Sequence, residues 1–443
     1  MSSVSASRLL EWFKKNGGSV HENLALTFSS EYGYLFTADK SLEKEATACV
    51  CPFSLTLSYL NCLPSPPTGI ESHAESSVCS SLIGKLKPNA VGTFLLAEQR
   101  TKGAESFWFP YIDALPREEV LTTPLWFHPE DLVWLWGTNL YSKTVPSEQT
   151  AVELRRAMYK EAWQSGITVL QEKGVDATKF TWELCLWAAT IFSSRSFTSN
   201  IATQNADESF PLLYPVIDIF NHRFGEKVFW NMEKGTFRLE LPEGAPTGEQ
   251  VFNNYAPKGN EELLMGYGFC IENNPCDQLV LRLAKPPGVV HLGLKSSMPS
   301  HFKSETWSVE ESGFYVRGRN HYAGAYANQS GLECLRGVQP ELVSALRIMV
   351  AFSFESSYTD PKHQQAELWW ATLDALSMRL QQKRDAITQW DGMLPATPQN
   401  RRQAFAKIYR DSQLRILNEV IEELDTVLGP LDREETTIFD VFL

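Results

Sequence analysis

The sequence predicts an α+β protein in which two β-rich regions flank one helical insert and an all-α region ends the chain. Short β-type runs occur before residue 63 and again after residue 211. Helical periodicity dominates from about residue 70 to residue 193 and returns from about residue 290 to the end. With 443 residues, the chain is too long for one ordinary hydrophobic core, so we expect two or three packed units.

Composition and charge restrict the class of protein. Hydrophobic residues make up 43% of the chain and aromatic residues 12%, which is typical of a globular protein and excludes a disordered or fibrous one. The formal net charge of -13 opposes direct binding to nucleic acid and favours cationic partners. We therefore expect a protein partner, and basic proteins suit this charge.

Cysteine usage and the amino terminus bear on the compartment. The eight cysteines are spread too thinly for a disulfide-rich secreted scaffold. Cys49 and Cys51 have no second Cys-x-x-Cys or His-x-x-x-His nearby, so we predict structural thiols and no metal. Residues 1–8 lack the apolar core of a signal peptide, and no run approaches the ~18 apolar residues of a membrane span. We expect a monomer in the cytoplasm, with the nucleus as the alternative, and no membrane association.

The first segment, residues 1–62, is expected to combine one helix with a small sheet. Apolar residues between Leu9 and Phe13 form one face of an opening helix, which Asn16-Gly17-Gly18 ends. Two β-type runs follow at residues 34–36 and 46–53. Prolines between residues 64 and 67 then break the chain. We place the first boundary at residue 63.

Residues 63–193 are expected to form the helical insert. Pro129 stands at the first turn of one helix. A capping box from Thr150 to Glu153 opens a longer helix, which Gly174 closes. A further apolar stripe between Trp182 and Phe192 predicts another helix, which ends the insert.

Residues 194–288 return to β structure. The apolar run Leu212–Ile219 predicts a strand. Apolar side chains alternate with polar ones from residue 228 to 232 and from 237 to 241, on either side of a Lys234-Gly235 turn, which predicts a hairpin. Gly248–Phe252 predicts one more strand.

Residues 289–443 are expected to be all-α. Apolar stripes at helical spacing run from Leu342 to Met349, from Trp369 to Leu380 and from Phe405 to Leu428. Gly429-Pro430 is expected to close the last helix. Because this region has no cluster of reactive groups, we expect it to select the acceptor rather than to perform chemistry.

Two polar segments that follow predicted strands are the candidates for chemistry. Asp218-Ile219-Phe220-Asn221-His222 leaves an apolar run, and its Asp and Asn are also compatible with a simple strand-end turn. In the second segment, from Asn253 to Phe269, Asn260 is placed to cap a short helix and Tyr267 lies between two glycines. Glycine lets the backbone approach a ligand closely, although such a tyrosine is also compatible with a core position.

Together these segments resemble the SET-domain methyltransferases, in the class that includes the plant Rubisco large-subunit lysine methyltransferase and fungal ribosomal-protein and elongation-factor lysine methyltransferases. The family has an Asn-His pair, a Gly-Glu-x-Val strand leading to a Tyr, an Asn-x-Glu-Leu helix and a final Tyr-Gly-Phe. This order is met by Asn221-His222, Gly248–Val251, Tyr255, Asn260–Leu263 and Tyr267-Gly268-Phe269. Ser194-Arg195-Ser196-Phe197 is similar to the Ser-Arg-x-Phe that ends the helical insert, and the region around Tyr409-Arg410 is similar to the substrate-binding domain of this class.

The resemblance implies a fold and an activity. The fold is the SET fold, with small β-sheets and a pseudoknot in which the segments around Asn221 and Tyr267 pass each other. The implied cofactor is S-adenosyl-L-methionine, whose methyl group is transferred to a lysine amine in a non-histone protein. A ribosomal protein or an elongation factor is the substrate that the class suggests.

The resemblance also assigns roles to residues. Tyr267 is expected to be catalytic, because its hydroxyl and nearby backbone carbonyls can orient an amine of pKa ~10.4 that has lost its proton. Asp218 and Phe197 are expected to contact the substrate. The cofactor is expected to be bound by Tyr32, Gly33, Arg195, Asn221, His222 and Tyr255.

Three positions depart from the family pattern. Tyr32-Gly33 keeps one glycine of the usual Gly-x-Gly turn, Arg223 replaces a common Ser, and Gln278-Leu279 stands where a tyrosine is often found. The missing cysteine cluster of histone-type enzymes disfavours histones as substrates. Two alternatives stay open: a SET fold repurposed for small-molecule biosynthetic chemistry or histidine methylation, and a non-catalytic protein that binds partners.

Overall fold

The computed structural model describes residues 3–67, 69–70, 77–142, 149–199, 209–233, 235–282, 314–318, 321–327, 329 and 331–443. The chain divides into two compact units, each built from segments that are distant in the sequence. The first unit comprises Met1–Leu121 and Arg155–Pro257, and the second comprises Thr122–Leu154 and Lys258–Leu443. The helical insert predicted for residues 63–193 is therefore shared between the two units.

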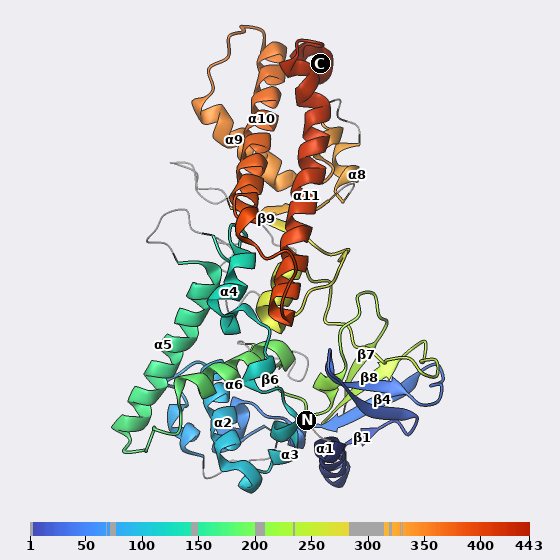
Figure 1. Cartoon of the computed structure of the whole chain (residues 1–443), viewed down its shortest axis with the longest axis vertical. Coiled ribbons are helices and arrows are strands. Elements are labelled where there is room, and N and C mark those ends of the chain that lie inside the picture. The colour runs from blue at the N-terminus through green and yellow to red at the C-terminus, as the bar shows by residue number, and fades with distance from the viewer. Residues whose placement is uncertain are drawn as a thin grey trace. The chain divides into compact units, whose positions relative to one another are not determined.

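The first unit contains the strands and most helices of the amino-terminal half (Figure 1). Its helices are α1 (Ser3–Lys15), α2 (Pro88–Lys102), α3 (Phe109–Ala114), α6 (Trp182–Arg195) and the part of α5 (Ala151–Glu172) from Arg155 onward. Its strands are β1 (Ser19–Val20), β2 (Leu24–Ser29), β3 (Gly33–Ala38), β4 (Ala46–Pro52), β5 (Phe197–Thr198), β6 (Pro211–Leu212), β7 (Phe229–Glu233) and β8 (Thr236–Leu241).

A four-stranded antiparallel sheet with the order β1-β4-β8-β7 lies at the centre of this β structure. Strands β4 and β8 pair although they are far apart in the sequence, with Cys51 opposite Phe237. In β8 the side chains of Phe237, Leu239 and Leu241 are buried, because alternate residues of a strand share one face. The predicted hairpin is confirmed by the β7–β8 pairing, while Lys234 of its predicted turn lies outside the described residues.

Two predicted strands of the first unit were wrong over most of their length. Leu212–Ile219 is a strand only at Leu212 and ends in the 3-10 turn η9 (Ile217–Ile219). Between them Val216 has a φ of 71°, which a β-branched residue does not adopt within a strand, so the chain turns there. Gly248–Phe252 is not a full strand, since it pairs with β3 through one bridge from Gln250 to Thr37 and through backbone hydrogen bonds to Phe36 and Ala38.

Most predicted helix ends agree with local hydrogen bonds. Helix α1 ends at Lys15, and Gly17 follows with a φ of 86°. The capping box of α5 is confirmed, since the Thr150 N–H donates to Glu153 Oε2 at 2.8 Å and the Glu153 N–H donates to Thr150 Oγ1 at 3.2 Å. Pro129 begins α4 (Pro129–Leu132), as predicted.

The second unit contains the long carboxyl-terminal helices (Figure 1). Its elements are α4, α7 (Asn260–Glu262), the π-helical turn η10 (Leu263–Tyr267), β9 (Leu279–Leu281), β10 (Phe314–Val316), α8 (Ala323–Tyr326), α9 (Pro340–Ser353), α10 (Pro361–Thr388), α11 (Arg401–Asp432) and α12 (Ile438–Phe442). Strand β10 pairs with β9. The region predicted to be all-α therefore also includes one strand of 3 residues.

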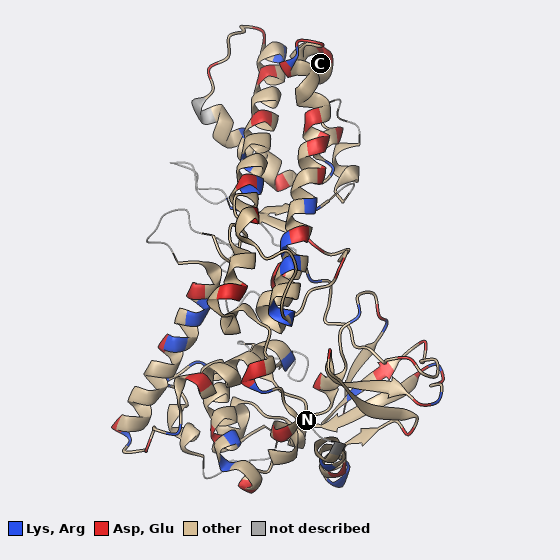
Figure 2. Ribbon diagram, viewed as in Figure 1, with Lys and Arg blue, Asp and Glu red and all other residues tan. Residues whose placement is uncertain are grey.

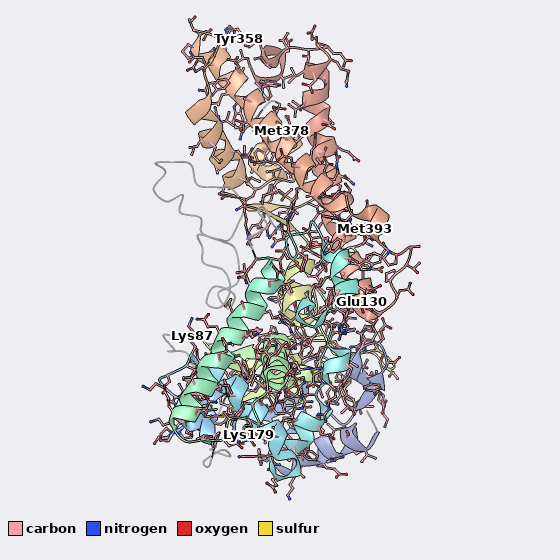
Figure 3. The ribbon with its side chains drawn as sticks, turned by 60° about the vertical axis from the view of Figure 1, so that its left-hand side comes forward. Lys87, Glu130, Lys179, Tyr358, Met378 and Met393 are labelled. Atoms are coloured by element: carbon pink, nitrogen blue, oxygen red, sulfur yellow. The ribbon has the colours of Figure 1, made fainter. Side chains whose placement is uncertain are left out.

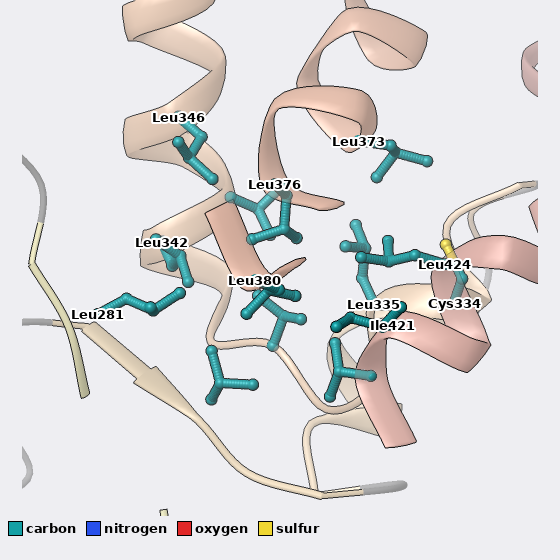
Figure 4. Close-up of a cluster of buried hydrophobic side chains, with 14 of the residues drawn as sticks. Leu281, Cys334, Leu335, Leu342, Leu346, Leu373, Leu376, Leu380, Ile421 and Leu424 are labelled. Carbon is teal, nitrogen blue, oxygen red and sulfur yellow. The ribbon is translucent and has the colours of Figure 1, made fainter. Parts of the chain in front are cut away.

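The core of the second unit confirms the three predicted helical stripes. Leu342 and Leu346 of α9 and Leu373, Leu376 and Leu380 of α10 pack with Ile421 and Leu424 of α11 (Figure 4). Leu279 and Leu281 of β9 belong to the same cluster, so the short sheet and the long helices share one core. The predicted end at Gly429-Pro430 was wrong, since α11 contains Pro430 and continues to Asp432. The missing N–H of a proline so near the end removes only one of the last helical hydrogen bonds.

The eight cysteines are free thiols, as predicted, and Cys276 is the one that is not buried. Burial raises the pKa of Cys62 to about 12, so this thiol stays protonated and unreactive at neutral pH. Among the helices in the described part of the chain, none is both long and apolar enough to cross a bilayer.

Candidate active site

A buried ion pair lies at the centre of the candidate site in the first unit. Arg195, at the end of α6, donates from Nη1 to Asp218 Oδ2 at 3.3 Å and to the Asp218 carbonyl at 3.1 Å. The Tyr111 hydroxyl of α3 donates to the same Oδ2 at 2.9 Å. The side chain of Asp218 is 0% exposed and that of Arg195 is 27% exposed. The pair thus connects a fully buried carboxylate to an arginine side chain that is partly exposed.

The electrostatics of this pair follow from its burial. Burial raises the pKa of Asp218, while Arg195 and the Tyr111 hydrogen bond oppose that rise. Burial also acts to lower the pKa of Arg195, but the Asp218 carboxylate together with Tyr111 and Tyr255 outweighs burial, and the pKa is raised. Asp218 Oδ1 is buried and has no hydrogen-bond partner among the described residues. Such an acceptor fits a donor group from a bound molecule.

A parallel bridge between His222 and Asn253 joins the two sequence motifs within the first unit. The Asn253 N–H donates to the Asn221 carbonyl at 2.8 Å, and the Tyr255 N–H donates to His222 Nδ1 at 3.0 Å. The rings of His222 and Tyr255 stack with centroids 5.1 Å apart. The Tyr255 hydroxyl donates to the Phe220 carbonyl at 2.9 Å. Because His222 Nδ1 accepts, this histidine carries its proton on Nε2 when it is neutral.

Asn221 presents a buried donor at this bridge. Its Nδ2 has no acceptor within the described ranges of the chain. Nearly all buried amide groups in folded proteins are hydrogen-bonded. The unpaired Asn221 Nδ2 therefore suits a hydrogen-bond acceptor on a bound ligand. The sequence predicts that Asn221 binds the cofactor, and an unpaired buried N–H group is compatible with that role.

The other predicted residues of the first unit lie in two different places. Phe197 packs edge to face against Tyr214, Trp230 and Phe237 at centroid distances of 5.5, 5.3 and 5.1 Å. Tyr32 ends the turn between β2 and β3 and is 56% exposed, and Gly33 is the first residue of β3. Gly33 has a φ of 74° and open space where a Cβ would stand, so a ligand can approach its backbone.

The departure at Arg223 leaves the bridge intact. Its N–H donates to the Asn253 carbonyl at 3.0 Å, a bond that any residue other than proline can make. The Arg223 side chain is 50% exposed, pairs with Glu226 and lies 4.5 Å from the ring centre of Phe252. It is therefore held at the surface of the first unit by its own partners.

Tyr267 ends the π-helical turn η10 in the second unit. Gly268 follows with a φ of 82°, and its N–H donates to the carbonyls of Leu263 and Leu264. A Cβ on Gly268 would lie 2.9 Å from Thr122 Oγ1 and from the Thr123 nitrogen, so only glycine fits. The close approach at Gly268 is to the backbone and side chain of Thr122 and Thr123, and it fixes the turn that carries Tyr267, while the predicted approach to a ligand stays a prediction.

The prediction that Asn260 caps α7 was wrong. Gly259 is the cap residue, and the Asn260 N–H donates to Asp277 Oδ1 at 2.9 Å. The Asn260 amide donates to Asp277 Oδ2 and to the Ile271 carbonyl, both at 3.0 Å, and Asn260 Oδ1 accepts from the Ile271 N–H at 2.9 Å. Asn260 therefore binds the segment that follows Tyr-Gly-Phe, because Asp277 supplies the acceptor for the helix start.

Sequence reasoning missed two buried residues that contact predicted ones. Tyr111 contacts Asp218, and no local pattern marks it, since it lies on a short helix beside other buried residues. Lys258 has a side chain that is 0% exposed, pairs with Glu262 and lies with Nζ 5.6 Å from the ring centre of Tyr267. The spacing of four between Lys258 and Glu262 is the one signal that could have found it.

The fold agrees with a solved structure. The crystal structure of the SET domain of LSMT bound to lysine and AdoHcy superposes with a TM-score of 0.64 and 18% sequence identity, covering 97% of this chain and 93% of that one. This likeness confirms the predicted α+β SET fold. No family model matches the chain.

Ribosomal lysine N-methyltransferase set10 of Schizosaccharomyces pombe (strain 972 / ATCC 24843) is 30% identical over 425 residues, covering 94% of this chain and 71% of that protein. The chain belongs to the SET-domain protein-lysine methyltransferases. This membership confirms the predicted family and enzyme class, and with them S-adenosyl-L-methionine as methyl donor.

More distant relatives of this methyltransferase carry two kinds of name. Ribosomal lysine N-methyltransferase 1 of Saccharomyces cerevisiae (strain ATCC 204508 / S288c) is 26% identical and covers 66% of this chain, which spans 53% of that protein. Actin-histidine N-methyltransferase of Xenopus tropicalis is also 26% identical. The match covers 62% of this chain and 45% of that protein.

Proposed function

We propose that this enzyme methylates the side-chain amine of a lysine in a ribosomal protein. The observation that supports a ribosomal protein as the substrate is the similarity of this chain, over 94% of its length, to the Schizosaccharomyces pombe ribosomal lysine N-methyltransferase. Ribosomal proteins are predominantly basic because they bind RNA, and the net charge of -13 favours their encounter with this enzyme. We propose that it acts as a monomer in the cytoplasm, without direct contact to nucleic acid.

The cofactor is proposed to lie against Arg195, Asn221, His222 and Tyr255, with the backbone of Tyr32-Gly33 as a further contact. The accessible part of Arg195 suits a carboxylate, and the unpaired Asn221 Nδ2 suits a hydrogen-bond acceptor. The stacked rings of His222 and Tyr255 offer an aromatic surface to a purine. When bound, S-adenosyl-L-methionine supplies an electrophilic methyl group on a sulfonium.

Asp218 and Phe197 are proposed to contact the acceptor, and Tyr267 is proposed to be the catalytic residue. The free Oδ1 of Asp218 can accept from an amine, and Phe197 belongs to an aromatic cluster that excludes water. The Tyr267 hydroxyl can hydrogen-bond a neutral amine and keep its lone pair directed at the methyl group. Tyr267 needs no metal for this role.

The second unit is proposed to select the protein acceptor. Between residues 416 and 432, α11 carries five acidic residues and no basic one, and the ribbon of this helix is coloured red at its acidic positions in Figure 2. Met378 of α10 is 52% exposed and Met393 is 61% exposed (Figure 3). Negative charge suits a basic protein, and exposed methionines adapt to varied apolar partners.

The function is tested with radiolabelled S-adenosyl-L-methionine and purified ribosomal proteins, translation elongation factors and actin as acceptors. We expect label in a ribosomal protein and, after hydrolysis, as methyllysine. Label in an elongation factor would correct the acceptor. Methylhistidine in actin would instead support the second candidate, to which the actin-histidine relatives point, and binding of the cofactor without transfer would support a partner-binding protein.

Asn221→Ala should weaken the binding of S-adenosyl-L-methionine by roughly tenfold or more, because a hydrogen bond to a charged ligand contributes ~1.5–3 kcal/mol. Isothermal titration calorimetry measures the affinity, and a thermal melt checks the fold. Asn231→Ala on β7 is the matched control, since Asn231 bonds only weakly to Glu240 at 3.4 Å. Equal affinity in the Asn221 variant and the wild type would count against the assignment.

A further inference from the structure

Lys258 is a buried cation beside the proposed catalytic tyrosine. Its side chain is 0% exposed, and Nζ lies 5.6 Å from the ring centre of Tyr267. Burial lowers the pKa of Lys258, and the Glu262 carboxylate opposes that shift. Burying such an ion pair is unfavourable unless its geometry is specific, so general stability does not explain why the pair is buried here.

The backbone holds this lysine at a fixed distance from the tyrosine. The Lys258 carbonyl accepts from Asn274 Nδ2 at 2.8 Å, which anchors the chain two residues before α7. Glu262, the last residue of α7, pairs with Lys258 Nζ, and η10 begins at the next residue and ends at Tyr267. The ion pair therefore spans the helical turn that leads directly into the tyrosine.

A cation at this place can act on the tyrosine in two ways. The ammonium is attracted to the negative face of the aromatic ring, which restricts the rotation of the ring. Its charge also favours negative charge on the phenol oxygen, and the low dielectric of a buried site strengthens that effect. Phe269, whose ring centre is 6.2 Å from that of Tyr267, provides a further wall.

We propose that Lys258 is a positioning residue for Tyr267, in which the ammonium, fixed by Glu262, holds the phenol in the orientation that methyl transfer requires. This rests on the proposed catalytic role of Tyr267. The Lys258 side chain itself touches neither the methyl group nor the acceptor in this proposal.

A double-mutant cycle tests the proposal in the full-length enzyme. Lys258→Met keeps an unbranched stem and removes the charge. We expect single-turnover transfer to slow by about tenfold at saturating cofactor, with the dissociation constant of S-adenosyl-L-methionine within about twofold of wild type. In the Tyr267→Phe background the same change should slow transfer by less than about twofold, because its target is already lost.

Two further variants separate positioning from stability. Lys258→Met/Glu262→Gln removes both charges, so it leaves no unpaired buried carboxylate if the single variant fails to fold, and it should be slow as well. Lys407→Met is the matched control, since Lys407 pairs with Asp411 at the same spacing on the surface of α11 and should transfer at the wild-type rate.

The outcomes that overturn the proposal are distinct from failure of the proposed role of Tyr267. If Tyr267→Phe is slow and Lys258→Met slows both backgrounds equally, Lys258 acts independently and the proposal is overturned. If Tyr267→Phe alone transfers at the wild-type rate, the role of Tyr267 fails and the proposal falls with it. A slow Lys258→Met whose effect vanishes in the Tyr267→Phe background supports it.

Discussion

Tyr267→Phe is expected to slow methyl transfer by a factor of about 100 or more while the protein keeps its fold and its affinity for S-adenosyl-L-methionine. The variant retains the ring that lies near Lys258 and Phe269 and removes only the hydroxyl. Loss of an oriented oxygen in the transition state should raise the barrier by several kcal/mol, at ~1.4 kcal/mol per tenfold in rate.

Single-turnover transfer measured beside a thermal melt distinguishes this role from a packing role. Tyr326→Phe is the matched control in the same unit, because the Tyr326 hydroxyl donates to the Val338 carbonyl at 3.0 Å within the core. That control should lower the melting temperature and leave the rate of the folded protein unchanged. A rate for Tyr267→Phe within about threefold of wild type, under ~0.7 kcal/mol of barrier, would remove Tyr267 from the mechanism.

The fold could be predicted from the sequence where one periodic pattern decides the structure. The alternation of Phe237, Leu239 and Leu241 and the long stripe of α11 bury one continuous face, so period and burial agree. The prediction failed at Val216, which adopts a left-handed φ that its side chain disfavours. No local sequence pattern predicts this backbone conformation, because the packing around Val216 imposes the turn.

The residues of the candidate site likewise fall into those that the sequence predicts and those that it does not. Arg195, Asp218, His222 and Tyr255 lie in short ordered motifs, and the structure brings them together in one unit. Within the first unit Tyr111 reaches Asp218 through packing that no local sequence pattern specifies, and within the second unit Lys258 lies beside Tyr267, with its spacing from Glu262 as the only local signal. Asn260 is a residue type that often caps helices, but its side chain hydrogen-bonds to Asp277 instead. Asp277 lies beside Asn260 only in the folded chain, so the sequence could not predict this partner.

Arg195→Met should both destabilise the first unit and weaken cofactor binding. The substitution leaves the Asp218 carboxylate buried without its cation, and breaking one side of such a pair costs about 3 kcal/mol or more in the free energy of unfolding. Loss of the accessible guanidinium should weaken the binding of S-adenosyl-L-methionine by about tenfold or more. Chemical denaturation and isothermal titration calorimetry measure the two effects separately.

The pH dependence of the Arg195→Met variant identifies the carboxylate as the source of its instability. Burial already raises the pKa of Asp218 in the folded protein, and removal of Arg195 takes away the largest opposing effect. A raised folded pKa stabilises the fold below the unfolded value of ~3.9, and that stabilisation is lost as pH rises through the folded pKa. The deficit in unfolding free energy relative to wild type should therefore be smaller at acidic pH than at pH ~7.

The double variant Arg195→Met/Asp218→Asn separates the structural role of the pair from the binding role of Arg195. An asparagine keeps an oxygen that can accept from the Tyr111 hydroxyl and carries no charge, so most of the stability should return and its pH dependence should disappear. Cofactor affinity should stay low, because the cation proposed to bind the cofactor is still absent. Recovery of both stability and affinity would show that Arg195 only supports the fold, and recovery of neither would show that the Asp218 charge is not the cause of the instability.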